Sequence, residues 1–331
     1  MGEEILIVEN LNTYISKSVG EEPIRILDRI NIVINEGDIL GLVGETGSGK
    51  TVLIDSIGQN LRNPLWMSAD NLSLSFDNKT VDLRNINQDD MKNIWGKGIC
   101  FIPPNARDNL NPILTVGKQF ANIIKAHSKM LSDREAKEKV IESFKKVNMP
   151  APERNFDSLP QALSGGMAQR VIISIALFLS PRLLLADEPT MGLDVTIQKQ
   201  VLDIFYTLIK KMDSSVILAT RDMGIVANYC DKVGVLCNGQ LVEFSNKREF
   251  FKNAKHPYSS YLLEAAFASH GKMLEKDFKK SASKKIFEVK TEIGCRFSNR
   301  CSIAKEECNL INPPEVIIGP NHFIKCHKVE V

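Results

Sequence analysis

The eight residues from Gly44 to Thr51 constrain this chain most, because they match the pattern G-x-x-x-x-G-K-[ST] of a phosphate-binding loop. The apolar run Asp38–Val43 precedes them and predicts a buried strand, whereas Val52–Ile57 begins a plausible helix. In this strand, loop and helix context, backbone N–H groups and the positive end of a helix dipole can bind phosphate oxygens. The sequence therefore predicts a nucleotide-binding site.

Each position of this loop has an expected role. Lys50 would reach the β- and γ-phosphates, Thr51 would hold Mg²⁺, and the glycines would let backbone N–H groups turn towards the phosphates. The predicted nucleotide-binding residues of the loop are Gly44, Glu45, Thr46, Gly47, Ser48, Gly49, Lys50 and Thr51. Tyr14, in an earlier predicted strand, could stack on a purine ring, although an ordinary strand aromatic is an equal alternative.

Composition limits the classes of protein that this chain can belong to. Its 331 residues are 43% hydrophobic and 25% charged, which suits a globular protein with one large domain plus an appendage, or two domains. A net charge of +2 implies no general polyanion-binding surface, so we expect no nucleic-acid partner. No apolar run is long enough to span a bilayer, and the acidic start lacks the features of a signal peptide, so we expect a cytoplasmic protein.

The segments before the central motifs alternate between strand-like and polar character. Ile5–Val8 and the segment around Tyr14 predict two strands, and Ile24–Ile34 predicts further antiparallel strand material. The polar stretch from Gln59 to Asn93 is expected to be irregular, and Ile99–Ile102 to be a short strand that two prolines end.

A helical region is predicted between residues 104 and 160. Ser132 and Glu135 form a capping-box pattern, which favours a helix starting there. The apolar residues that follow fall on one helix face, and Pro150 closes the segment; they are Ala136, Val140, Ile141, Phe144 and Val147. We expect this region to be a mostly helical insertion.

Two further motifs carry chemistry. Ser164-Gly165-Gly166 opens a helix and so offers backbone N–H groups to an anion. Leu183–Glu188 is an apolar strand that ends in two carboxylates: Asp187 would accept the Mg²⁺ shell and Glu188 would polarise the attacking water. The next buried strand, Ser215–Ala219, leads to Arg221, and Asn238-Gly239 predicts a hairpin turn.

These motifs, in this order, resemble those of an ATP-binding-cassette (ABC) ATPase over nearly the whole chain. Residues 44–51 resemble the Walker A motif, 163–170 the signature, 183–188 Walker B and 193–194 the D-loop. The resemblance implies an α/β fold: an ABC-type P-loop nucleotide-binding domain with an antiparallel β subdomain, a helical subdomain and a small cysteine-rich C-terminal tail. It implies domain bounds of 1–103 and 164–250 for the ATPase core, 104–163 for the helical subdomain and 251–331 for the C-terminal extension.

Within that family, the chain looks like the ATPase subunits of dipeptide and oligopeptide importers, on the basis of Leu110-Asn111-Pro112, His256-Pro257-Tyr258 and the cysteine tail. The resemblance implies ATP and Mg²⁺ as cofactors and a peripheral position on the cytoplasmic face of the membrane. It also implies a second, non-identical ATPase subunit, two transmembrane permeases and, indirectly, an extracytoplasmic substrate-binding protein. The alternatives are a soluble ABC ATPase without a permease and a regulatory subunit with negligible turnover.

Two positions depart from the family pattern. Alignment on the motifs puts Pro104 where the family has its Q-loop glutamine, and Arg221 where it has its switch histidine. An arginine keeps positive charge near the γ-phosphate but is always protonated and cannot mimic a neutral imidazole. We therefore expect Glu188 and Arg221 to be the catalytic residues of a site that binds ATP and turns it over slowly.

Four of the seven cysteines are clustered near the C-terminus: Cys295, Cys301, Cys308 and Cys326. The other three lie in apparent core segments. Four thiolates can hold a [4Fe–4S] cluster or a tetrahedral Zn²⁺, and spacing alone does not decide between them and unligated thiols. Similarity to the tail of the importer ATPases favours [4Fe–4S]. The charged stretch 272–285 before this tail is expected to be a solvated linker.

Overall fold

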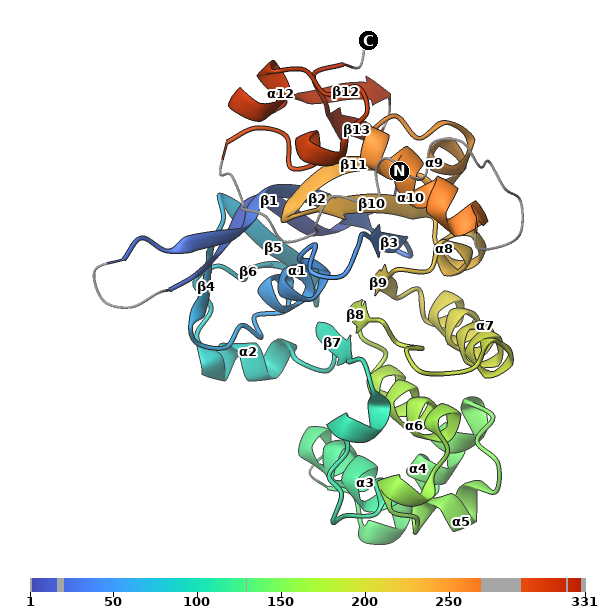
Figure 1. Cartoon of the computed structure of the whole chain (residues 1–331). Helices are drawn as coiled ribbons and strands as arrows, with labels where there is room; N and C mark the ends of the chain where they lie inside the picture. The colour runs from blue at the N-terminus through green and yellow to red at the C-terminus, as the bar shows by residue number, and fades with distance from the viewer. Residues whose placement is uncertain (1, 17–20, 129, 269–292, 320, 329–331) are drawn as a thin grey trace. The chain divides into compact units, whose positions relative to one another are not determined.

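The computed structural model describes residues 2–16, 21–128, 130–268, 293–319 and 321–328 (Figure 1). It divides the chain into two compact units. The first consists of Glu3–Ile86 and Ile217–Val331, and the second of Asn87–Val216. Within the described residues, no helix combines the length and apolar character that crossing a membrane requires. The predicted linker 272–285 lies outside the described residues.

An antiparallel sheet forms the N-terminal part of the first unit. Its main path runs in the order β2-β1-β5-β6, and β4 also pairs with β1. The strands are β1 (Glu4–Ile15), β2 (Ile24–Asn35), β4 (Leu65–Ser68), β5 (Asn71–Phe76) and β6 (Lys79–Asp82). The expected antiparallel start is confirmed, but the prediction of two strands within residues 5–15 was wrong. β1 is one strand of 12 residues, in which shifts of register around Leu11 interrupt the side-chain alternation.

The second sheet of this unit holds the strand that leads into the phosphate loop. Within the unit its order is β12-β13-β11-β10-β3-β9. The strands are β3 (Ile39–Val43), β9 (Ser215–Thr220), β10 (Lys232–Cys237), β11 (Gln240–Asn246), β12 (Glu315–Gly319) and β13 (His322–Lys325). β3 is fully buried and pairs in parallel with β10, which explains why its sequence is apolar throughout.

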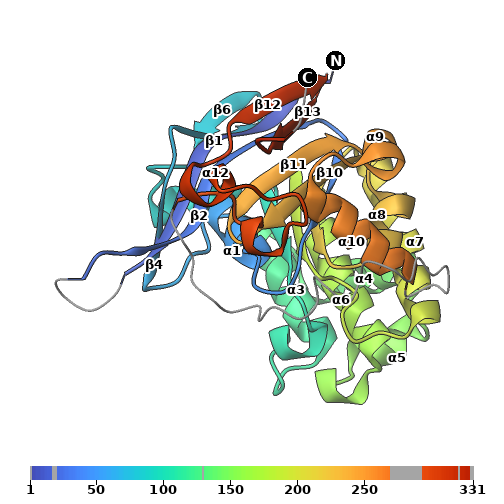
Figure 2. The same cartoon turned by 45° about the horizontal axis from the view of Figure 1, so that its top comes forward.

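The predicted hairpin turn lies in this sheet, which also takes up part of the C-terminal tail. Asn238 and Gly239 have φ of 44° and 84° and connect the antiparallel strands β10 and β11, which confirms the hairpin. The C-terminal tail joins the same sheet, because Glu243 and Phe244 of β11 face Ile324 and Phe323 of β13 (Figure 2). The tail is therefore bonded to the sheet that carries the phosphate loop.

Helices complete the first unit. They are α1 (Lys50–Ile57), α8 (Met223–Tyr229), α9 (Lys247–Asn253), α10 (Pro257–Ala268) and α12 (Glu307–Leu310). α1 follows the phosphate loop, and the buried side chains of Leu53, Ile54 and Ile57 explain its apolar pattern. α8 starts at an Asp222 side chain that accepts the backbone N–H groups of Gly224 and Ile225.

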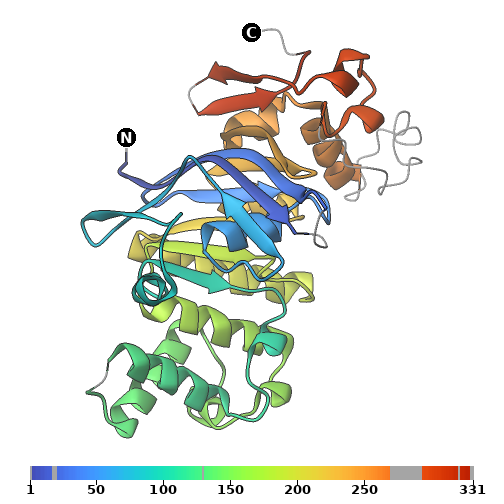
Figure 3. The same ribbon diagram turned by 90° about the vertical axis from the view of Figure 1, so that its left-hand side faces the viewer.

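The second unit contains a helical group and two parallel strands. Figure 3 shows the green helices of residues 116–156 together at the bottom of the view. The elements are α2 (Gln88–Ile94), β7 (Ile99–Ile102), α3 (Val116–His127), α4 (Asp133–Lys146), α5 (Pro152–Phe156), α6 (Gly165–Phe178), β8 (Leu183–Asp187) and α7 (Val195–Met212). The capping box at α4 is confirmed, as are the buried positions of Ala136, Val140 and Phe144.

The expectation of irregular structure from Gln59 to Asn93 was wrong. This stretch contains β4, β5, β6 and most of α2. β5 alternates polar and apolar residues, and its Leu72 and Leu74 are fully buried. Its pairing partner is β1, far away in sequence, so the strand is stabilised by a contact that local sequence does not reveal.

Candidate functional site

The phosphate loop has the geometry of an anion site. α1 begins directly after Gly49, whose φ of 107° is left-handed, and no side chain caps this helix end in the described part of the chain. The first-turn N–H groups therefore point into the loop, with the positive end of the helix dipole behind them. The predicted strand, loop and helix arrangement is confirmed.

The Lys50 side chain is hydrogen-bonded to the backbone of this loop. It is buried, and its Nζ donates to the carbonyl oxygens of Gly44 at 2.7 Å and Glu45 at 3.0 Å. Ser48 is also buried, and its N–H donates to the Glu45 carbonyl at 3.1 Å. These bonds place an ammonium group inside the ring of backbone atoms that would surround a phosphate.

Arg221 reaches the same loop. Its Nη1 donates to the Thr46 hydroxyl at 3.3 Å, although 175 residues separate the two in sequence. The bond joins the end of β9 to the turn of the phosphate loop. The structure thus brings together two of the predicted site residues and places a fixed positive charge beside the loop.

Tyr14 lies on β1 and stacks against Trp66 of β4, with ring centroids 4.4 Å apart and planes 19° from parallel. The Arg25 guanidinium lies 5.7 Å from the Tyr14 centroid. Trp66 is 43% exposed, so the two rings form a partly exposed aromatic pair. The sequence prediction overlooked Trp66, because only the pairing of β1 with β4 brings it beside Tyr14.

The two predicted carboxylates follow β8 in the second unit. Asp187 is the last residue of the strand and is buried, whereas Glu188 is half-buried with a left-handed φ of 41°. The turn is closed by the Met191 N–H, which donates to the Glu188 carbonyl at 3.0 Å. A non-glycine residue in this conformation is uncommon, and the turn gives the two neighbouring carboxylates different environments.

The predicted signature lies at the start of α6. Ser164 is the N-cap, and its hydroxyl accepts the Met167 N–H at 3.2 Å. Ser164 and Gly165 are exposed, whereas Gly166 packs so closely that a Cβ would lie 2.5 Å from the Ile197 side chain. The helix therefore presents its N-terminal edge to solvent while its second residue must stay small.

Pro104, at the position predicted to replace the Q-loop glutamine, lies shortly after β7. Its carbonyl accepts a hydrogen bond from Asn109 Nδ2 at 2.8 Å.

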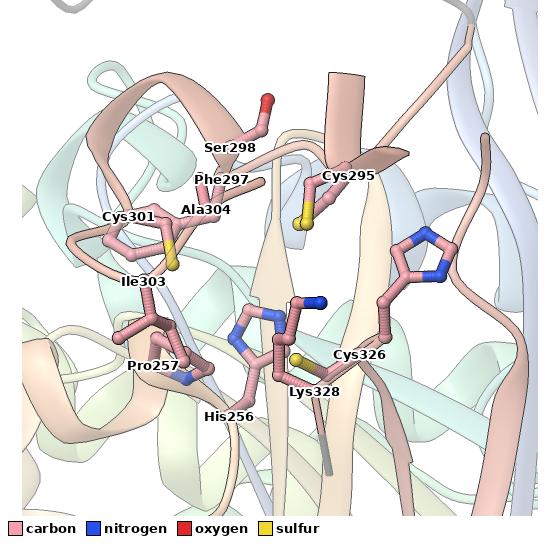
Figure 4. Close-up of a pocket in the computed structure, with 12 residues that line it drawn as sticks. His256, Pro257, Cys295, Phe297, Ser298, Cys301, Ile303, Ala304, Cys326 and Lys328 are labelled. Carbon is pink, nitrogen blue, oxygen red and sulfur yellow. The ribbon is translucent and has the colours of Figure 1, made fainter. Parts of the chain in front are cut away.

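All four C-terminal cysteines line one small cavity of the first unit, together with His256, Phe297 and Lys328. Figure 4 shows the thiols of Cys295, Cys301 and Cys326 around this cavity. None of the seven cysteines, all of which lie in the described part of the chain, forms a disulfide bond. Among the described residues, no group of three or more His, Cys, Asp or Glu side chains is arranged to hold a metal ion.

The pKa values of two of these thiols are raised. Burial, with a smaller contribution from the neighbouring sulfurs of Cys326, Cys301 and Cys308, raises the pKa of Cys295 to about 11, against the effect of the Phe297 N–H. Burial likewise raises the pKa of Cys301. A cationic partner would favour the thiolate form of both side chains.

Sequence reasoning missed the residues that connect this tail to the phosphate loop. Arg300 donates from Nη1 and Nη2 to the Glu45 carboxylate at 2.6 and 2.9 Å, and the Glu45 N–H donates to the Tyr258 hydroxyl at 2.9 Å. Glu45 itself was a predicted site residue. Tyr258 was quoted only for the family resemblance and Arg300 was given no role, because contacts across more than two hundred residues leave no local pattern.

Comparison with known proteins identifies the family. Residues 27–191 match the family model described as ABC transporter, and residues 242–308 match the model described as Oligopeptide/dipeptide transporter, C-terminal region. The dipeptide transport ATP-binding protein DppD of Haemophilus influenzae is 36% identical over 309 residues, covering 92% of this chain and 90% of that protein. The oligopeptide transport ATP-binding protein AppD of Bacillus subtilis is 34% identical over 328 residues, covering 98% and 97%.

A solved structure agrees with the family models. The post-hydrolysis dimer of the ATP-binding cassette MJ0796, bound to ADP and Pi, has a TM-score of 0.63 at 25% identity and covers 74% of this chain and 99% of that chain. The phosphate loop and the strand that ends in carboxylates are features that P-loop ATPases use for phosphoryl transfer. The chain therefore belongs to the ABC transporter family of ATP-hydrolysing proteins, in the branch that carries the oligopeptide/dipeptide transporter C-terminal region.

Proposed function

We propose that this chain is the ATPase subunit of an importer for dipeptides or oligopeptides. The observation that carries the proposal is the match of residues 242–308 to the peptide-transporter C-terminal region, in a chain aligned almost end to end with peptide-transport ATP-binding proteins. The subunit would sit on the cytoplasmic face of the membrane with two permeases, and an extracytoplasmic binding protein would deliver the peptide. Residues 1–103 and 164–250 would form the ATPase core, 104–163 the helical subdomain and 251–331 the extension.

In this proposal, ATP binds between two cassettes. The loop 44–51 of this chain holds the phosphates, and Ser164, Gly165 and Gly166 complete the site of the other cassette. Tyr14 contributes to adenine binding as part of the partly exposed aromatic pair that it forms with Trp66. Thr51 and Asp187 hold Mg²⁺, which neutralises phosphate charge when it is bound. Glu188 orients and polarises the attacking water. ATP binding then closes the pair, and hydrolysis reopens it.

We further propose that the second cassette is a different protein and that the two ATP sites are unequal. Pro104 offers no side-chain amide for Mg²⁺ or water, and Arg221 cannot act as a neutral imidazole. The bond from Arg221 to Thr46 supports a place for this arginine beside the phosphates. The site built on this chain's phosphate loop would therefore bind ATP and hydrolyse it slowly.

The test is the ATPase rate of the purified transporter with single substitutions. Loss of one γ-phosphate contact slows turnover by roughly 10² to 10³. Glu188→Gln in this chain should therefore lower the rate of the whole transporter only modestly. Ser164→Arg in this chain, which damages the other site, should remove most of it. Loss of all turnover in Glu188→Gln would contradict unequal sites, and failure of permeases to co-purify would favour an ABC ATPase that works without them.

For the cysteine cavity we propose a [4Fe–4S] cluster. The four thiols line one cavity, and the raised pKa values of Cys295 and Cys301 fit a site that needs positive charge to hold thiolates. In such a cluster each thiolate binds its own iron, so the thiols need not converge on one point as they would around Zn²⁺. The cluster would act as a staple for a small segment with little core of its own.

Anaerobically purified protein tests this assignment. It should be brown, with broad absorption at about 400 nm, and Cys301→Ser should bleach it. Cys100→Ser is the matched control, because Cys100 lies in β7 outside the cavity. Colourless protein with one zinc per chain would reject the cluster in favour of a structural zinc site.

A further inference from the structure

The loop from Cys295 to Cys301 carries two arginines, one beside each of its terminal cysteines, and both reach towards the nucleotide site. Arg300 precedes Cys301 and forms the two-bond ion pair with Glu45 in the phosphate loop. Arg296 follows Cys295 and pairs with Asp28 at 3.4 Å, where the two side chains are 6% and 2% exposed. The same short loop thus borders the cysteine cavity and contacts both Glu45 in the phosphate loop and Asp28 in β2.

The Arg300 pair is held firmly. The side chains of Arg300 and Glu45 are 17% and 30% exposed, so solvent screens the pair less than a surface ion pair. The guanidinium lies 4.9 Å from the Tyr261 ring centroid and 5.5 Å from that of Phe297. Bidentate pairing with a stacked guanidinium fixes position as well as charge.

Glu45 is therefore held at both its side chain and its backbone by the C-terminal part of the chain. Its N–H donates to Tyr258 of α10, and its carbonyl accepts the Lys50 ammonium at 3.0 Å. Moving Glu45 would move the carbonyl that positions Lys50. An unpaired carboxylate so close to the phosphate site would also repel the negative charge of a nucleotide.

The second arginine reaches the loop through intermediate residues. The Asp28 N–H donates to the Gly239 carbonyl at 2.9 Å, and the Gly239 N–H donates to the Ser48 carbonyl at 2.8 Å. Gly239 has no room for a side chain, since a Cβ would lie 1.9 Å from the Ile26 carbonyl oxygen. Arg296, Asp28 and Gly239 thus form a tightly packed chain of contacts that ends at Ser48.

We propose that Arg300 is a positioning residue for nucleotide binding, which holds the first turn of the phosphate loop and cancels the charge of Glu45. The Cys295–Cys301 loop is then thermodynamically linked to nucleotide affinity. Linkage is reciprocal: a change that displaces Arg300 weakens ATP binding, and bound ATP stabilises the Cys295–Cys301 loop. The position of the Cys295–Cys301 loop would thus regulate ATP affinity. This holds whichever metal, if any, the cysteines bind.

The first test is ATP affinity of the full-length chain, measured by calorimetry under conditions without turnover. Arg300→Ala should weaken binding about five- to twentyfold, and Arg300→Lys should weaken it less. In the Arg300→Ala background, Glu45→Gln should restore part of the affinity by removing the uncompensated carboxylate. The matched control is Arg84→Ala, which removes a similar arginine pair with Asp82 on β6 and should leave affinity unchanged.

The second test measures the reciprocal effect, that of bound ATP on the Cys295–Cys301 loop. Amide hydrogen exchange in residues 295–301 should slow severalfold when ATP binds to the wild-type chain, and this protection should disappear in Arg300→Ala. Circular dichroism and melting temperature would verify that the variant is folded. Wild-type ATP affinity in folded Arg300→Ala would overturn the proposal, as would strictly additive effects of the Arg300 and Glu45 substitutions. A colourless protein that still shows the linkage would reject only the iron–sulfur cluster.

Discussion

At the scale of single residues, Lys50 combines burial with charge. An ammonium group that is almost fully buried is stabilised only by its acceptors, which in this structure include the Gly44 and Glu45 carbonyls. A bound phosphate would offer it a negatively charged acceptor instead. The loop is therefore organised before nucleotide arrives, with the charge already in place.

Lys50→Ala should weaken ATP binding about ten- to a hundredfold, because it removes a charge-assisted contact of roughly 1.5 to 3 kcal/mol. Calorimetric titration of ATP into the purified chain measures this directly. Lys92→Ala on α2, where the side chain is 67% exposed, is the control and should bind like wild type. Unchanged affinity in Lys50→Ala would remove this lysine from the site.

Residues that act through local spacing could be predicted from the sequence. Gly49, Lys50 and Ser164 each make their contacts within a few residues of sequence, so a local sequence pattern was enough to predict their positions. Arg300 could not be predicted in the same way, because its partner Glu45 is 255 residues away. The pairing of β11 with β13 joins the tail to the sheet, and no local rule specifies that pairing.

At the scale of elements, α4 is a helix whose start could be predicted from the local sequence alone. Its Ser132 hydroxyl accepts the Glu135 N–H at 3.3 Å, while the Glu135 carboxylate accepts the Ser132 N–H at 2.8 Å. Both bonds of the predicted capping box are present. The helix position was predictable because its start signal and its apolar face agree.

Ser132→Ala should lower the free energy of unfolding by about 1 kcal/mol, because it leaves a helix N–H without its acceptor. Ser132→Thr keeps the hydroxyl and should lose less. Urea denaturation followed by circular dichroism measures both variants. Equal losses in the two variants would mean that the capping oxygen contributes nothing to stability.

The elements that sequence reasoning missed have a common physical cause. β4, β5 and β6 have four to six residues each, and β5 is flanked by polar turns. Strands this short are stable only when paired, and the central partner of both β4 and β5 is β1. Their existence depends on tertiary pairing, which periodicity within a short window does not report.

At the scale of the whole molecule, the buried carboxylate of Glu243 is one of the groups that link the C-terminal tail to the sheet. Glu243 on β11 is fully buried and accepts the N–H groups of Lys255 and His256 at 2.9 Å each. His322 of β13 contacts the same carboxylate at 3.1 Å. Burial alone would raise the pKa of Glu243, but these bonds, led by that of His322, bring it below the usual value.

This lowered pKa predicts acid sensitivity with a definite sign. The unfolded chain takes up the proton first, so the stabilisation is complete above about pH 4.5 and is lost as pH falls through the lower pKa of the folded state. Glu243→Gln should therefore be less stable than wild type at neutral pH and lose less stability on acidification. Urea denaturation between about pH 6 and pH 3 measures both quantities.

Glu264→Gln is the control for this experiment, since Glu264 is an exposed carboxylate on α10. It should follow the wild-type pH dependence. A Glu243→Gln variant with the same loss of stability on acidification as wild type would show that this carboxylate does not govern the acid response.

The discontinuity of the first unit has a consequence for synthesis on the ribosome. Its phosphate-loop strand β3 pairs with β10, and the unit needs both Glu3–Ile86 and Ile217–Val331. The second unit is nearly continuous, so its sequence is finished while the sheet that contains β3 still lacks β10, β11, β12 and β13. During synthesis, the apolar strand β3 therefore stays without its partner β10 until the segment Ile217–Val331 leaves the ribosome. A prematurely terminated chain would carry an intact phosphate-loop sequence and yet be a substrate for chaperones and proteases.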